Sequence, residues 1–164
     1  MNSIIGYYTT QFGELWEKSL IDLVKESVEG VLSSTGLEAG QIDAIYFGNM
    51  MGGIIENNLL FSARIAELLG VNIPIYRVEA ACASGGMAFQ MAHEYLKAHT
   101  NKTVLVIGAE KMTDITADEV TRGLSSASAE EEQLAGLTFP GLYGMIAQVY
   151  LGRYGYTEEN LASI

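Results

Sequence analysis

The chain has 164 residues and a formal charge of −11, with nine Lys and Arg against twenty Asp and Glu. This balance argues against a nucleic-acid-binding protein, and no cluster of basic residues offsets it. We expect a globular protein without a signal peptide or membrane span, because no apolar run approaches the roughly 20 residues that cross a bilayer.

The first two thirds of the chain alternate between strand-like and helix-like segments. Strands are predicted at short β-branched or aromatic runs, and helices where apolar residues recur every three or four positions. Ser19 can cap the first helix and Gly36 can end it. In chain order, the expected elements are a strand at 3–8, a helix at 18–36, a strand at 44–50, a helix from Asn57 or Asn58 to Gly70, a strand at 74–80, a helix at 83–97 and a strand at 102–110.

This alternation predicts an α/β fold, in which a mostly parallel sheet with right-handed crossovers carries helices on both faces. The turn "GNMMGG" at 48–53 follows a strand but matches no phosphate-binding loop, so we expect a flexible turn there. No His/Cys pair has metal-ligand spacing, and no G-x-G-x-x-G motif occurs.

The last third of the chain has a different character. Residues 113–141 show no clear period and carry an acidic run, which predicts either a functional excursion or a mobile segment. A helix is expected at 142–155, with Gly155 at its end. Thr157 and the acidic residues after it predict the start of another helix.

The single cysteine, Cys82, lies where a predicted strand leads into a predicted helix. One cysteine cannot form an internal disulfide, which favours a reducing, cytoplasmic setting. In open parallel sheets, functional residues gather at the carboxyl ends of strands. A helix N-terminus there would stabilise a thiolate and the oxyanion of an acyl group. A lone cysteine is more often an inert apolar residue, so the pattern alone leaves both readings open.

The helix after Cys82 carries no charge from Ala83 to Ala92. We therefore expect residues 83–97 to form the most buried helix, with Gly85 and Gly86 allowing another element to pack closely against it. If the chain is studied without a partner, the face carrying these two glycines should be exposed, which would favour association.

A thiol nucleophile needs a nearby base, and the two histidines do not supply one. His93 lies roughly 16 Å along the helix from Cys82, at about 1.5 Å per residue, and His99 lies farther away. Both are expected to be solvated helix residues.

Several separated segments resemble the thiolase family. "VEAACASGGMAFQMA" at 78–92 resembles its nucleophile segment, and "VLVIGAEKMTD" at 104–114 resembles the strand and turn that follow. Residues 13–32 and 137–164 resemble the archaeal and sterol-carrier-type branch. The similarity extends from about residue 5 to the last residue, in order.

The resemblance implies a thiolase-like half with a five-stranded, mostly parallel sheet, incomplete here. It implies a core at 1–112 and, at 113–164, the truncated start of an excursion that binds coenzyme A. Cys82 would be the nucleophile of an acetyl-CoA acetyltransferase in lipid metabolism, with its backbone N–H in an oxyanion hole. Acyl-CoA would be the substrate and no separate cofactor is expected. The substrate-binding candidates are Met112, Phe139, Pro140 and Leu142.

The family's remaining catalytic segments are an Asn-Glu-Ala-His-like segment, a Gly-His-Pro histidine and a Cys-x-Gly cysteine, and none occurs here. We therefore expect either a complementary C-terminal half or a homo-oligomer as partner, and little activity from this chain alone. Lys111 and Arg122 are the only basic residues between Lys102 and Arg153, so most contacts to CoA phosphates must come from elsewhere. The alternatives are a 3-hydroxy-3-methylglutaryl-CoA synthase, with Glu79 as the nearest carboxylate, and a non-catalytic lipid-binding or scaffold subunit.

Overall fold

The computed structural model describes residues 2–164 and separates into two compact units. The first unit extends to Ile115, and the second runs from Thr116 to Ile164. Each unit is described by itself below.

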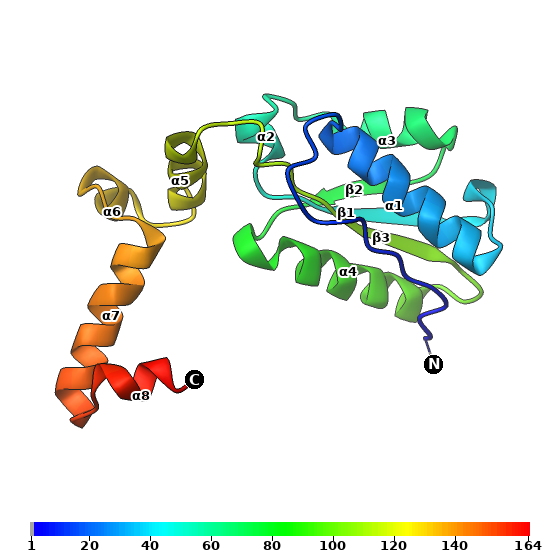
Figure 1. The fold of residues 1–164 in the computed structure, drawn as a ribbon. Helices are drawn as coiled ribbons and strands as arrows, with labels where there is room; N and C mark the ends of the chain where they lie inside the picture. The colour runs from blue at the N-terminus through cyan, green and yellow to red at the C-terminus, as the bar shows by residue number, and fades with distance from the viewer. Residues whose placement is uncertain (1) are drawn as a thin grey trace. The chain divides into compact units, whose positions relative to one another are not determined.

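A three-stranded parallel sheet forms the centre of the first unit (Figure 1). Its strands are β1 (Ala44–Gly48), β2 (Ile75–Val78) and β3 (Val104–Gly108), in the order β2-β1-β3. The central strand β1 is buried along its whole length. Gly48 lies opposite Val78 on one side and Gly108 on the other, so the three carboxyl ends meet at one edge. Three of the four predicted strands are confirmed.

Helices cover both faces of this sheet, as the alternating pattern predicts. The helices α1 (Leu20–Thr35) and α3 (Phe61–Leu69) pack on one face, and α4 (Ser84–Ala98) packs on the other (Figure 1). Burying aliphatic and aromatic side chains between these layers is the main stabilising contribution. The core on the α1 and α3 face contains Leu20, Val24, Val28, Ile42, Ile45, Phe47, Phe61, Ile65 and Ile107.

The predicted helix ends are confirmed at most positions. Ser19 forms a capping box with Asp22, and Gly36 ends α1 in the left-handed conformation. Gly70 ends α3 in the same way. The predicted start of α3 is wrong, because the Asn58 side chain accepts the Leu60 N–H at 2.7 Å and holds a turn before the helix. Two short helices, η1 (Ala39–Gln41) and α2 (Gly52–Ile55), precede α3.

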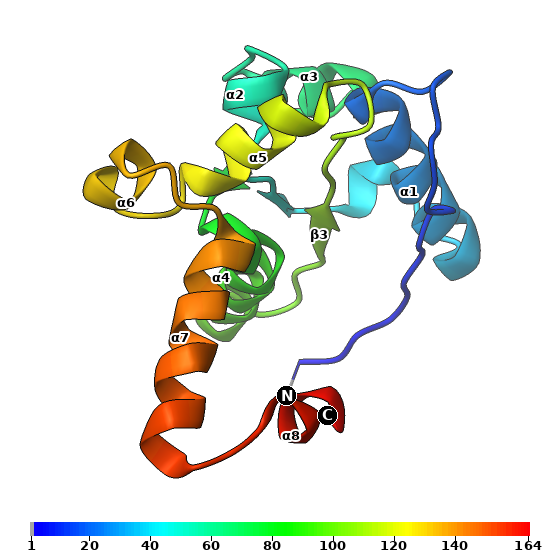
Figure 2. The ribbon, with the colours of Figure 1, turned by 60° about the vertical axis from the view of Figure 1, so that its left-hand side comes forward.

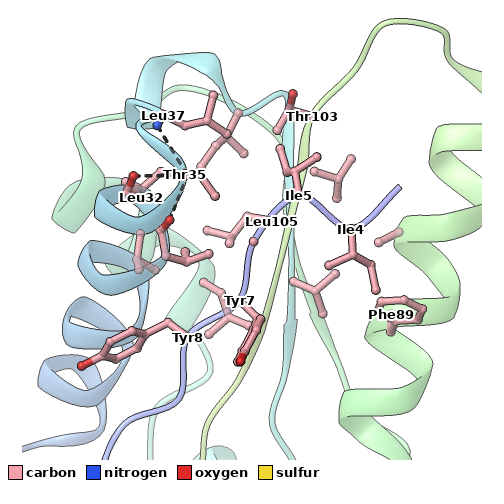
Figure 3. A pocket seen from close by; sticks show the side chains of 18 of the residues that line it. Ile4, Ile5, Tyr7, Tyr8, Leu32, Thr35, Leu37, Phe89, Thr103 and Leu105 are labelled. Atoms are coloured by element: carbon pink, nitrogen blue, oxygen red, sulfur yellow. Dashed lines mark hydrogen bonds between the residues drawn. The ribbon is translucent and has the colours of Figure 1, made fainter. Parts of the chain in front are cut away.

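The strand predicted at residues 3–8 does not form. The segment runs past α1, with Tyr8 against Gly30 and Gly6 against Thr35. A glycine in the middle of a short strand weakens it, which favours these contacts over sheet pairing. Figure 3 shows Ile5 and Tyr8 beside a cavity of about 590 Å³ lined by residues from this segment, α1, α4 and β3.

The prediction that residues 83–97 form the most buried helix is wrong for this chain. The sheet covers one stripe of α4, formed by Ser84, Ala88 and Ala92 at four-residue spacing. The other faces are exposed, including Gly85 and Gly86. An exposed face at the two glycines is what the sequence predicts for the chain without a partner. A side chain at either glycine would meet no atom within 4 Å, so close packing does not explain them here.

The second unit contains α5 (Ala117–Ser125), α6 (Glu130–Leu134), α7 (Phe139–Tyr154) and α8 (Glu158–Ala162), which follow one another along the chain (Figure 2). The sequence predicts α8 and the Gly155 end of α7 correctly. It misses α5 and α6, although a Thr-x-x-Glu capping box begins α5. The helix α7 begins earlier than residue 142, since Thr138 caps it. Within residues 2–164, no helix combines the length and apolarity needed to cross a membrane.

Candidate functional site

Cys82 lies in a tight turn at the carboxyl edge of the sheet. The chain leaves β2 after Val78, forms the short 3-10 helix η2 (Ala81–Ala83), and continues directly into α4. Its side chain is exposed. The predicted position of Cys82 at a strand-to-helix junction is therefore confirmed. Its thiol is exposed, unlike the buried and inert cysteine that is the commoner case.

The backbone just before Cys82 has an unusual conformation. Ala81 has a φ of +48°, in the left-handed region that residues with a side chain rarely adopt. The Ala83 N–H donates to the Ala80 carbonyl at 2.9 Å and closes the turn. Such conformations persist where the surrounding contacts hold them, and they are frequent at functional sites.

Two polar side chains make the contacts that shape this turn. The Ser84 hydroxyl donates to the Ala81 carbonyl at 2.6 Å and accepts the Ala80 N–H at 2.9 Å. Oε1 of Glu79 accepts the Ala81 N–H at 2.5 Å. Among residues 2–164, the Cys82 N–H has no hydrogen-bond acceptor, so this donor remains available beside the thiol.

The turn packs against the carboxyl end of β1. A methyl group at Gly48 would lie 2.8 Å from both the Gly85 Cα and the Ser84 carbonyl oxygen. Real side chains do not tolerate such contacts with backbone, so glycine at 48 is what lets α4 approach the sheet. The close packing that the sequence assigns to Gly85 and Gly86 depends on Gly48 instead.

A hydrogen-bonded network beside this turn was not predicted from the sequence. The buried Asn49 side chain donates to the Ala109 carbonyl at 2.9 Å and accepts from Arg77 Nε at 3.0 Å. The Glu110 carboxylate accepts the N–H groups of Met50 and Met51. The network links the carboxyl ends of all three strands. The turn at 48–53 is thus held by hydrogen bonds, contrary to the expected flexible turn. The available signal was the set of polar residues in or just after the three strands, Asn49, Arg77 and Glu110.

Lys111 is also buried near this edge. Its ammonium donates to Thr113 Oγ1 at 2.7 Å, pairs with Asp114, and lies 5.7 Å from the centre of the Trp16 ring. Only 4% of the lysine side chain is exposed. Its charge is therefore neutralised locally, and the expectation that this chain contributes few contacts to CoA phosphates stays a prediction.

The two histidines lie far along α4, as expected. The imidazole of His93 contacts the Asn2 amide at 3.4 Å, and His99 stacks on Tyr95 with ring centres 4.2 Å apart. Both are exposed. Neither provides a base for Cys82, and no group of three or more potential metal ligands is found in residues 2–164.

The substrate-binding candidates lie in different units. Met112 is half-buried in the segment after β3 in the first unit, whereas Phe139, Pro140 and Leu142 form the first turn of α7 in the second. Their role in binding substrate stays a prediction.

Comparisons with known proteins identify relatives along the whole chain. The model of the thiolase N-terminal domain matches residues 3–164. The acetyl-CoA acetyltransferase of Methanocaldococcus jannaschii is 44% identical over 162 residues, covering 98% of this chain and 41% of that protein. The corresponding protein of Methanothermobacter thermautotrophicus is 39% identical over 164 residues, covering 99% of this chain and 42% of that protein. Among solved structures, AbyA1, a tetronic acid condensing enzyme, aligns with 56% of this chain and 30% of its own at 21% identity and a TM-score of 0.48.

The chain therefore spans about two fifths of the length of these archaeal relatives. The match to the family model includes both the Cys82 turn and all four helices of the second unit. On these findings, the chain belongs to the thiolase family and corresponds to its N-terminal domain.

Proposed function

We propose that this chain supplies the nucleophile of a thiolase-type acyltransferase that acts on acyl-CoA, with acetyl-CoA as its substrate. The observation that carries the proposal is the exposed Cys82 thiol in a held turn at the N-terminal end of α4, with a free backbone N–H beside it. The relatives named acetyl-CoA acetyltransferases support the reaction class.

We propose that this chain performs the first half of the reaction only slowly and once per thiol, because no side chain acts as a base for Cys82 and water must carry its proton. The Cys82 sulfur attacks the thioester carbonyl, the bond from carbonyl carbon to CoA sulfur breaks, and the proton lost by Cys82 ends on the CoA thiol. The negative charge that develops on the carbonyl oxygen can accept the Cys82 N–H. An acetyl thioester on Cys82 results.

The second half of the reaction requires a base that this chain does not provide near Cys82. Forming a carbon–carbon bond means removing a proton from the methyl carbon of another acetyl-CoA. His93 is roughly 16 Å away along α4, at about 1.5 Å per residue. We propose that sequence outside these 164 residues supplies the base, either in the same protein or in a partner chain. We also propose that the complete enzyme is oligomeric and acts in the cytoplasm.

Glu79 does not favour the synthase alternative. One of its carboxylate oxygens accepts the Ala81 N–H at 2.5 Å, which gives this side chain a structural part in the turn. No observation favours the non-catalytic scaffold either, and the exposed thiol speaks against it.

The test is a chimera in which residues 1–164 replace the matching part of the Methanocaldococcus jannaschii acetyl-CoA acetyltransferase. The isolated chain should form no acetoacetyl-CoA in the steady state, whereas the chimera should form it from acetyl-CoA. The same chimera with Cys82→Ser should be inactive with an unchanged circular dichroism spectrum, because the exchange is nearly isosteric.

Two results would contradict the proposal. A folded chimera that produces acetoacetyl-CoA equally well with Cys82→Ser would remove the nucleophile assignment. Steady production by the isolated chain would show that it contains a base, and Glu79 would then be the first residue to replace.

A further inference from the structure

The turn before Cys82 is held in a conformation that its own residues do not favour. Ala81 adopts a φ of +48° although its side chain disfavours this region. Glycine adopts it without this cost, and no glycine stands here. Some other group must therefore keep Ala81 in place.

The buried Ser84 side chain forms hydrogen bonds that hold the backbone at Ala81. Its residue is 5% exposed, and its hydroxyl both donates and accepts within the turn. The acceptor is the carbonyl of Ala81, which belongs to the same peptide group as the Cys82 N–H, so the hydroxyl holds the orientation of that peptide directly. The donor is the N–H of Ala80, one peptide group farther back, which ties the hydroxyl to the start of the turn. The other peptide group beside Ala81 is held by the exposed Glu79, whose carboxylate accepts the Ala81 N–H.

The position of Ser84 is itself set by the sheet. The backbone of Ser84 and Gly85 packs so closely on Gly48 that a methyl group there would be 2.8 Å away. A contact path thus leads from β1 through the Ser84 hydroxyl to Ala81 and its neighbour Cys82. If Ala81 relaxed to a negative φ, the peptide carrying the Cys82 N–H would rotate.

We infer that Ser84 is a positioning residue for acylation of Cys82, because it fixes the direction of the Cys82 N–H. The inference rests on the proposed function, in which that N–H stabilises the oxyanion. Ser84 contacts neither substrate nor thiol in this role and acts through the Ala81 backbone.

The test compares two reactions of the same thiol in the full 164-residue chain. Acetylation by acetyl-CoA passes through an oxyanion, whereas alkylation by iodoacetamide does not. Both rate constants are measured by intact mass at one pH, for the wild type and Ser84→Ala. Ser27→Ala is the matched control, since Ser27 donates to the Val24 carbonyl in α1.

In Ser84→Ala, acetylation should slow at least about tenfold, a conservative value when loss of one oxyanion donor costs about 10²–10³ in rate. Alkylation should stay within about twofold, since it needs no such donor. Ser27→Ala should alter neither rate. Adding Ala81→Gly to Ser84→Ala should recover part of the acetylation rate, because glycine adopts a positive φ without hydrogen bonds from the Ser84 hydroxyl. Ser84→Thr keeps the hydroxyl and should retain the rate even if Ser84→Ala folds poorly.

The possible results distinguish failure of the proposed function from failure of the inference about Ser84. A wild type that is alkylated but never acetylated overturns the proposed function and the inference with it. A wild type that is acetylated at the same rate as Ser84→Ala overturns the inference alone. If Ser84→Ala slowed acetylation and alkylation equally, or if adding Ala81→Gly recovered none of the acetylation rate, Ser84 would have only a structural role. Either result would also overturn the inference.

Discussion

In the first unit, β1 buries all five of its residues, whereas α7 in the second unit has sixteen residues and buries none. The sequence of α7 is also mostly apolar, with Gln148 and Arg153 as its strongly polar residues. Tyr143, Ile146, Val149 and Tyr154 of α7 are all exposed. A helix that is apolar on all sides is suited to burial on all sides. The first unit therefore contains its own core and the second does not, so equivalent substitutions in the two units should change the unfolding free energy by different amounts.

The largest difference is expected for aromatic truncation. Phe47→Ala removes a fully buried ring that packs against Phe61 and should cost about 3–5 kcal/mol of unfolding free energy. Tyr143→Ala, at a residue 67% exposed in α7, should change it by less than about 0.5 kcal/mol. Urea unfolding followed by circular dichroism measures both. Equal losses of unfolding free energy in the two variants would contradict the conclusion that only the first unit has a core.

Adding a methyl group should have opposite signs in the two units. Gly48→Ala forces a side chain against the backbone of α4 and should destabilise the chain by about 1–3 kcal/mol. Gly144→Ala, inside α7, meets no atom within 4 Å and should favour the helix by up to about 1 kcal/mol. The readouts are the urea midpoint and the helical signal at 222 nm. An unchanged urea midpoint for Gly48→Ala would contradict the close packing of α4 against Gly48.

The smallest difference concerns two surface carboxylates. Hydrogen bonds from the Lys102 ammonium and the Thr103 N–H hold the pKa of Asp43 below its ordinary 3.8. Hydrogen bonds from the Thr116 backbone and side chain similarly lower the pKa of Glu119 from 4.5. A carboxylate with a lowered folded pKa stabilises the fold above its unfolded pKa, and this effect is lost as pH falls through the folded value.

Asp43→Asn should therefore lower the Tm at pH 7, and the difference from wild type should shrink as the pH falls below 3.8. Asp43 links the starts of β1 and β3 in the cooperative core. Glu119→Gln affects only the start of α5, so it should leave the Tm of the core unchanged at every pH. A Tm difference for Asp43→Asn that stays constant down to pH 3 would contradict this explanation.

The sequence was sufficient for elements whose signals are local. Ser19, Gly36 and Gly70 mark helix ends through their own backbone preferences, and the Val-Leu-Val-Ile run of β3 is typical of a strand covered on both faces. The sequence was insufficient where distant residues decide. Residues 3–8 have a strand composition, yet they pair with no strand and contact α1 through Gly6 and Tyr8.

The same distinction applies to the candidate site. The position of Cys82 between a strand and a helix could be predicted from the order of elements. The roles of Ser84 and Gly48 could not, because they depend on the left-handed conformation of Ala81 and on how closely α4 approaches β1. The network around Asn49 joins residues about 60 positions apart, which no local pattern indicates.

The central claim is that Cys82 accepts an acyl group, and mapping the acetylated position tests it most directly. The full chain is incubated with acetyl-CoA at neutral pH and digested, and its peptides are analysed by mass spectrometry before and after hydroxylamine, which cleaves thioesters. The account predicts a single hydroxylamine-sensitive acetyl group on the peptide containing Cys82, and none in Cys82→Ser. Acetyl groups found only on lysines, or an unmodified Cys82 that still reacts with iodoacetamide, would contradict it.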